Sequence, residues 1–127
     1  MNMQRVISII ILSTLLIVVA CNHNIYKQGK DLYESNCAAC HMPDGSGVGD
    51  LYPALSSLGP EYDYSYISCF VINGKKSENS VLEMVAIKGL SDVQISNIVN
   101  YIRSEMNDLE GEINISQIRK QLTDCTE

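Results

Sequence analysis

The first twenty residues differ in hydrophobic pattern from the rest of the chain. Residues 6–20 form an apolar run that only serine and threonine interrupt, and Arg5 is the only charged residue before it. The run has about fifteen residues, whereas an apolar helix needs roughly twenty to span a bilayer. Residues 1–20 are therefore predicted to be a signal peptide, and the mature chain is expected to be exported.

Apolar residues at helical spacing predict four helices in the remaining chain, over residues 26–36, 61–72, 91–106 and 116–122. The third has the clearest start, because Ser91 and Gln94 match a capping box. Its apolar stripe consists of Ile95, Ile98, Val99 and Ile102. Residues 43–59 are rich in glycine and proline, which excludes a regular helix there.

An acidic composition limits the classes of partner. The 127 residues include 9 basic and 15 acidic side chains, which gives a net charge of −6. Removal of Arg5 with the signal peptide leaves eight basic and fifteen acidic residues, a net charge of −7 on one small domain. This charge argues against nucleic acid or anionic lipid as a target and favours soluble partners with a basic docking face. One phenylalanine and no tryptophan leave few large core residues, so a cofactor would help to fill the interior.

The segment NCAACHMPDGSG at residues 36–47 holds the candidate chemistry. Cys37, Cys40 and His41 match C-x-x-C-H, the signature of c-type haem attachment. In such a site, two thiols add across the vinyl groups of haem and the adjacent imidazole binds the iron. We therefore predict one haem c, attached through Cys37 and Cys40, with His41 as a ligand of the iron.

Two other interpretations of this motif are weaker. A zinc site needs four ligands, and the only other histidine, His23, lies next to the predicted signal peptide. A thioredoxin-like dithiol is expected within a βαβ pattern, whereas the flanking sequence has helical and turn patterns. Haem attachment is the preferred interpretation.

Cys21 directly follows the predicted signal peptide. The junction Val18-Val19-Ala20-Cys21 resembles a bacterial lipoprotein signal, in which the cysteine is acylated before cleavage. Two or three acyl chains would hold the protein on a membrane, facing the periplasm or the cell exterior, because each buried methylene contributes about 0.8 kcal/mol. Residues 21–25 would then form a lipidated tether. The alternative is an ordinary signal peptide with Cys21 incidental.

Cys69 and Cys125 are the two cysteines left without a role. In an oxidising compartment free thiols tend to become paired, so we predict a disulfide between them, carried by the helix over 116–122. Such a bond would stabilise the fold by roughly 4 kcal/mol in the chain-entropy model. The alternative is two buried, unpaired thiols.

The chain resembles the small monohaem class I cytochromes c. The resemblance lies in GKDLYESNCAACHMPDGSGVGDLYPAL at residues 29–55 and LSDVQISNIVNYIR at residues 90–103. It implies an all-α fold around one haem, with the first and last family helices crossing where Gly29 meets Tyr101. We expect the cytochrome c domain to occupy residues 26–106, followed by a C-terminal extension over 107–127.

The same resemblance implies further residues around the haem. The carbonyl of Pro53 would accept a hydrogen bond from the second ring nitrogen of His41, and Leu55 would pack on the haem. Met84 would be the second axial ligand, since Met42 is too close to His41 and Met106 lies beyond the final family helix. The family commonly has proline after this methionine, whereas Val85 follows it here.

Three functions remain open at the level of sequence. The preferred one is one-electron transfer, without enzyme activity, by a membrane-tethered cytochrome with His41 and Met84 on the iron. A second is a haem protein with an open distal site, either a small-ligand sensor or a peroxidase-like enzyme. A third is an electron-relay subunit of a larger respiratory complex.

Overall fold

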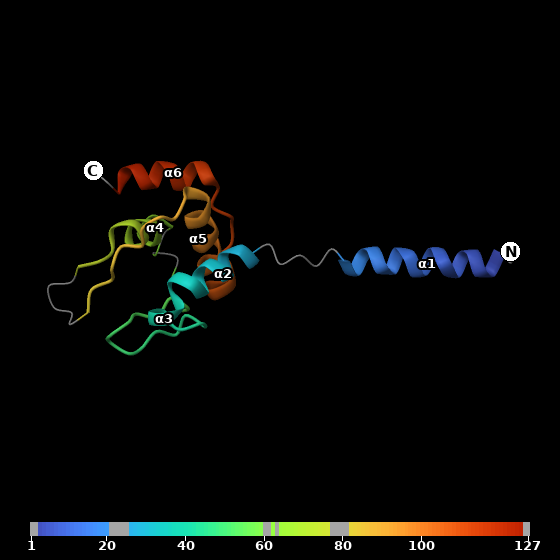
Figure 1. Ribbon diagram of the computed structural model, residues 1–127, viewed down its shortest axis with the longest axis horizontal. Coiled ribbons are helices and arrows are strands. Elements are labelled where there is room, and N and C mark those ends of the chain that lie inside the picture. The colour runs from blue at the N-terminus through green and yellow to red at the C-terminus, as the bar shows by residue number, and fades with distance from the viewer. Residues whose placement is uncertain (1–2, 21–25, 60–61, 63, 77–81, 126–127) are drawn as a thin grey trace.

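Helices form nearly all the regular structure of the protein (Figure 1). The computed structural model describes residues 3–20, 26–59, 62, 64–76 and 82–125. The helices are α1 (Met3–Ala20), α2 (Lys27–Asn36), α3 (Ala38–His41), α4 (Tyr64–Asn73), α5 (Asp92–Asn107) and α6 (Ile115–Asp124). Within these ranges there are two isolated β-bridges but no strand. The predicted all-α fold is confirmed.

Helix α1 covers the predicted signal peptide. Figure 1 shows it apart from the other helices, which pack together. No helix in the described part of the chain is long and apolar enough to cross a membrane. Cys21 and the predicted tether over residues 21–25 lie outside the described residues.

Helices α2 and α5 cross at Gly29, as the resemblance implied. A Cβ atom at Gly29 would overlap the carbonyl oxygen of Asn97 and lie 2.7 Å from the Cβ of Tyr101. Only glycine therefore lets the two helices approach this closely. Beside the crossing, the rings of Tyr33 and Tyr101 pack with their centroids 5.6 Å apart.

Helix α5 packs against the rest of the protein through two hydrophobic clusters. The first, which we call the motif cluster, contains Tyr33, Cys37, Ile98, Tyr101 and Ile102. The second, the extension cluster, contains Val71, Ile95, Val99, Ile113 and Ile118. The predicted apolar stripe is therefore divided between two cores, one beside the cysteine motif and one under the C-terminal extension.

Several predicted helix boundaries were wrong. Helix α4 begins at Tyr64, because the chain still bends at residue 62, and the short helix α3 was not predicted at all. The capping box of α5 is present as predicted, and Asn114 forms a second one, unpredicted, at the start of α6. Because Asn114 accepts from two amides there, α6 begins earlier than the sequence pattern indicated.

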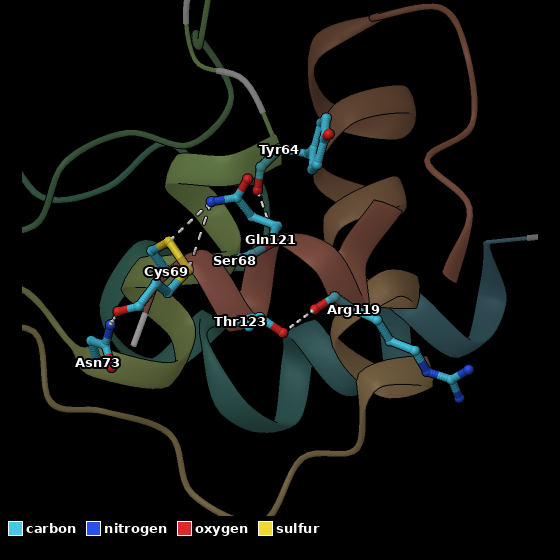
Figure 2. Close-up of a disulfide and its surroundings, with 8 residues drawn as sticks. Tyr64, Ser68, Cys69, Asn73, Arg119, Gln121 and Thr123 are labelled. Carbon is cyan, nitrogen blue, oxygen red and sulfur yellow. Dashed lines mark hydrogen bonds between the residues drawn. A yellow bond between two sulfur atoms is a disulfide. The ribbon is translucent and has the colours of Figure 1, made fainter. Parts of the chain in front are cut away.

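The C-terminal extension returns to helix α4 and is bonded to it covalently. Cys69 of α4 and Cys125, the residue after α6, form a disulfide between positions 56 apart in the sequence. Figure 2 shows this bond between the two helices, with Gln121 above it. Two buried side chains of α5, Ser96 and Asn100, hold the loop before α6 by hydrogen bonds to the carbonyl oxygen of Ile113. The extension is thus part of the folded domain.

Candidate functional site

The two cysteines of the motif lie within one turn of backbone. Cys37 ends α2, where its amide donates to the carbonyl of Tyr33 at 2.8 Å. The same residue begins α3, and its carbonyl accepts from the amides of Cys40 at 3.1 Å and His41 at 2.9 Å. This turn places both thiols and the imidazole within five consecutive residues, 37–41, at the start and end of one short helix. Both thiols are free.

The environments of the two thiols differ. The side chain of Cys37 is buried in the motif cluster, whereas that of Cys40 is exposed. Burial raises the pKa of the Cys37 thiol to about 11, and the neighbouring Cys40 acts in the same direction. Because the pKa is raised, the Cys37 thiol stays protonated at neutral pH in the folded, haem-free chain.

His41 is buried with its ring fixed from one side. Its Nδ1 lies 2.9 Å from the carbonyl oxygen of Pro53. A carbonyl oxygen only accepts, so Nδ1 carries the proton and Nε2 keeps its lone pair for a metal. This is the contact that the resemblance implied, and it orients the imidazole as partners of metal-binding histidines do.

The loop after His41 is folded back so that Pro53 reaches the imidazole. The amide of Gly47 donates to the carbonyl of His41 at 3.0 Å, and the amide of Leu55 donates to the carbonyl of Gly45 at 2.7 Å. Gly47 has a φ of 68°, and a Cβ there would overlap the carbonyl oxygen of Tyr52. Glycine at this position therefore permits the close approach of the two halves of the loop.

Tyr33 supports this loop from α2, which the sequence did not reveal. Its side chain is fully buried, and its hydroxyl donates to the carbonyl of Met42 at 2.8 Å. Burial raises the pKa of Tyr33, so the hydroxyl remains a donor. The hydrogen bond satisfies a carbonyl at a residue with a φ of 66°, which few non-glycine residues adopt.

Asn107 is a second supporting residue that the sequence did not reveal. Its amide nitrogen donates to the carbonyl of Leu55 at 2.7 Å, and its amide oxygen accepts from the amide of Leu58 at 2.8 Å. These bonds join the last residue of α5 to the segment that the resemblance placed against haem. Leu55 itself packs on the motif cluster.

Met84 belongs to a separate segment, between α4 and α5. It is partly buried, and its backbone forms an antiparallel bridge with Lys75, just beyond the end of α4. Met106, which the sequence placed beyond the final family helix, lies within α5. Met106 packs on the motif cluster beside Gly45, in the loop that follows His41.

The donor atoms of the site fit a covalently attached haem. Two free thiols lie one turn apart, and the adjacent imidazole has one nitrogen fixed by protein and the other available. By contrast, the described residues contain no group of three or more His, Cys, Asp or Glu side chains placed to hold a metal ion. The geometry thus favours haem attachment over the zinc interpretation.

Comparison with known proteins decides the family. The sequence model of the family described as Cytochrome c matches residues 26–105, well over half of the chain. The chain belongs to the cytochrome c family. Membership implies haem c attached covalently through cysteines, and Cys37 and Cys40 are the pair present in this cytochrome. Iron in haem c takes up and releases one electron, and electron transfer is the chemistry typical of this family.

Its relatives include both small cytochromes and larger subunits. Cytochrome c-554(548) of Halomonas halodenitrificans is 35% identical over 69 residues, which cover 54% of this chain and 83% of the relative. The cytochrome c subunit of alcohol dehydrogenase (quinone) from Gluconobacter oxydans is 32% identical over 104 residues, 75% of this chain. Those residues span only 22% of that subunit.

A solved structure shares the fold. The c-type cytochrome XoxG from Methylobacterium extorquens AM1 superposes with a TM-score of 0.54. The likeness covers 79% of this chain and 66% of XoxG, at 22% sequence identity. It supports the class I cytochrome c fold that the sequence predicted.

Proposed function

We propose that this cytochrome carries single electrons outside the cytoplasm while tethered to a membrane by lipid on Cys21, with His41 and Met84 as the axial ligands. The observation that carries the proposal is the fixed imidazole of His41, since the Pro53 carbonyl leaves Nε2 free for iron. Met84 supplies a thioether from a different segment, held by backbone hydrogen bonds to Lys75. A His/Met pair raises the potential and leaves no open coordination position.

The surface charge and the relatives indicate the kind of partner. Seven excess acidic charges on the mature chain would steer redox partners with a basic docking face. The cytochrome c subunit of an alcohol dehydrogenase (quinone) matches 75% of this chain. This match favours, as a second candidate function, an electron relay inside a dehydrogenase or oxidase complex. Co-purification from detergent-solubilised membranes would separate a relay subunit from a freestanding carrier.

Met84→Ala tests the axial ligand and the alternative of an open distal site. We expect the variant to keep its covalent haem, to become high-spin and to bind carbon monoxide readily when reduced, because the position opposite His41 is then open. Its potential should fall on the order of 0.1 V, within the roughly 0.8 V that axial ligands control. Absorption spectra with and without carbon monoxide, and a redox titration, provide the measurement.

The unmodified cytochrome is the reference for this test. Its ferrous spectrum should be low-spin and unchanged by carbon monoxide at neutral pH. Ready binding of carbon monoxide by the unmodified protein, together with no further change on Met84→Ala, would instead support a small-ligand sensor or a peroxidase-like enzyme.

Cys21→Ala tests the lipid tether. Without the thiol there is no site for acylation, and at least two buried chains are needed for stable membrane association. We expect the variant to lose the mass of the lipid, and the form that is still exported to move from the membrane to the soluble fraction. Cell fractionation with haem staining and mass spectrometry measure both. A Cys21→Ala protein that stays with the membrane after a salt wash would contradict the proposal.

A further inference from the structure

We propose that the C-terminal extension positions Met84, and that Cys69, Cys125 and Asn73 are the positioning residues that connect them. The inference rests on the proposed function, in which Met84 is an axial ligand. The extension fixes the end of α4, and the end of α4 in turn holds the backbone of Met84. The extension would therefore act on the ligand without touching it.

The first connection joins the extension to the last turns of α4. Cys69 is bonded to Cys125, and four residues further along α4 the Asn73 side-chain amide donates to the Cys125 carbonyl at 2.9 Å. Figure 2 shows both attachments on the same side of α4, with the Gln121 amide directed at the sulfur atoms. The end of α6 therefore holds α4 by one covalent bond, by the hydrogen bond of Asn73, and by the Gln121 amide, which donates to the Cys69 sulfur.

The second connection joins α4 to the segment that carries Met84. The amide of Lys75 donates to the carbonyl of Met84 at 2.9 Å, and the amide of Met84 donates back at 3.1 Å. A third bond runs from the amide of Ile87 to the carbonyl of Val71 at 2.8 Å. Backbone bonds thus attach the Met84 segment both inside α4 and just beyond it.

Gly74 brings the two backbones into direct contact. It has a φ of 71°, and a Cβ there would overlap the carbonyl oxygen of Met84 and lie 2.9 Å from the amide nitrogen of Ala86. The turn that ends α4 is therefore packed against residues 84–86 without a side chain between them. A shift of this turn has to move the Met84 backbone with it.

Two residues next to Met84 have exposed side chains. The side chain of Val85 is 78% exposed, and Glu83 is exposed as well. Ile87 is the nearest following residue that packs on the hydrophobic clusters. The backbone hydrogen bonds to Val71 and Lys75, within and just beyond α4, are therefore a main support of this segment.

If α4 were held less firmly, Met84 would be dissociated from the iron in a larger fraction of the molecules. An added ligand binds only the molecules in which Met84 is dissociated, so its apparent affinity rises in proportion to their fraction. If loss of the disulfide raises this fraction from about 1% to about 10%, the apparent affinity increases roughly tenfold. The resting spectrum would still be dominated by the form with Met84 bound.

Imidazole titration of the ferric, haem-loaded protein tests the inference. The variants are Cys69→Ser/Cys125→Ser, which removes the disulfide, and Asn73→Ala, which removes only the hydrogen bond. We expect the apparent affinity for imidazole to increase about tenfold in the double variant and by a smaller factor in Asn73→Ala. Titrations are made well below the melting temperature of each variant, with circular dichroism as the check of folding.

Asn114→Ala is the matched control. It removes the capping box at the other end of α6, where Asn114 accepts from the amides of Ser116 and Gln117. Loss of a cap typically costs about 1 kcal/mol, so thermal stability should fall in this variant also. Its affinity for imidazole should remain unchanged, which separates positioning of Met84 from general loss of stability.

The outcomes distinguish this inference from the proposed function. Equal imidazole affinities in the unmodified, disulfide-free and Asn73→Ala proteins, with much tighter binding by Met84→Ala, would overturn only the inference. Equal increases in the disulfide-free and Asn114→Ala proteins would overturn it too, since any loss of stability would then suffice. Tight binding by the unmodified protein, with no change on Met84→Ala, would overturn the axial-ligand proposal itself.

Discussion

His41→Ala is expected to give an exported chain that lacks stably bound haem. Alanine supplies no nitrogen for the iron, and the described residues contain no group of three or more His, Cys, Asp or Glu side chains placed to hold a metal ion in its place. The buried ring would also leave a cavity next to the carbonyl of Pro53. Mass spectrometry for the porphyrin increment, with the pyridine haemochrome spectrum, measures the loss, which should be nearly complete.

Pro53→Ala is the control for this result. Pro53 contributes only a backbone carbonyl to the imidazole, and alanine keeps that acceptor. The control should retain covalent haem and a low-spin spectrum. A His41→Ala protein with a full complement of haem and an unaltered spectrum would contradict the assignment of His41 as a ligand.

Gly29→Ala is expected to destabilise the protein by about 3 kcal/mol, because the new methyl group would overlap the carbonyl oxygen of Asn97. The two helices would have to separate, which disrupts the packing of Tyr33 on Tyr101. For a domain of this size, the melting temperature should fall by roughly 10–20 °C. Thermal denaturation of the haem-loaded protein, followed by circular dichroism, provides the measurement.

The direction of the change in melting temperature makes this test specific. At an open helical site, glycine to alanine stabilises by up to about 1 kcal/mol, so a higher melting temperature would exclude a close crossing at Gly29. Ser35→Ala is the control on the same helix, because Ser35 is exposed. It should change the melting temperature little.

Sequence reasoning succeeded where the evidence is local or repeated. The motif cysteines and His41 are adjacent in sequence, so one helical turn brings them together without help from the rest of the fold. The capping box at Ser91 could be recognised for the same reason, because its two residues are only three positions apart. The apolar stripe of α5 predicted a buried face, although not its division between two clusters.

Contacts between distant segments were not accessible in this way. The role of Tyr33 could not be predicted, because nothing local indicates that its hydroxyl meets the carbonyl of Met42. Asn107 reaches Leu55 across 52 positions. The close approach of Gly74 to Met84 likewise depends on how the chain returns to α4.

The division of α5 between the motif cluster and the extension cluster has a consequence for shortening the protein. Ile95 and Val99 of α5 pack against Ile113 and Ile118 of the extension. Truncation after Asn107 would therefore expose an apolar surface on α5, the helix that also packs into the motif cluster. A minimal version of this cytochrome would therefore need polar replacements along that surface to avoid self-association.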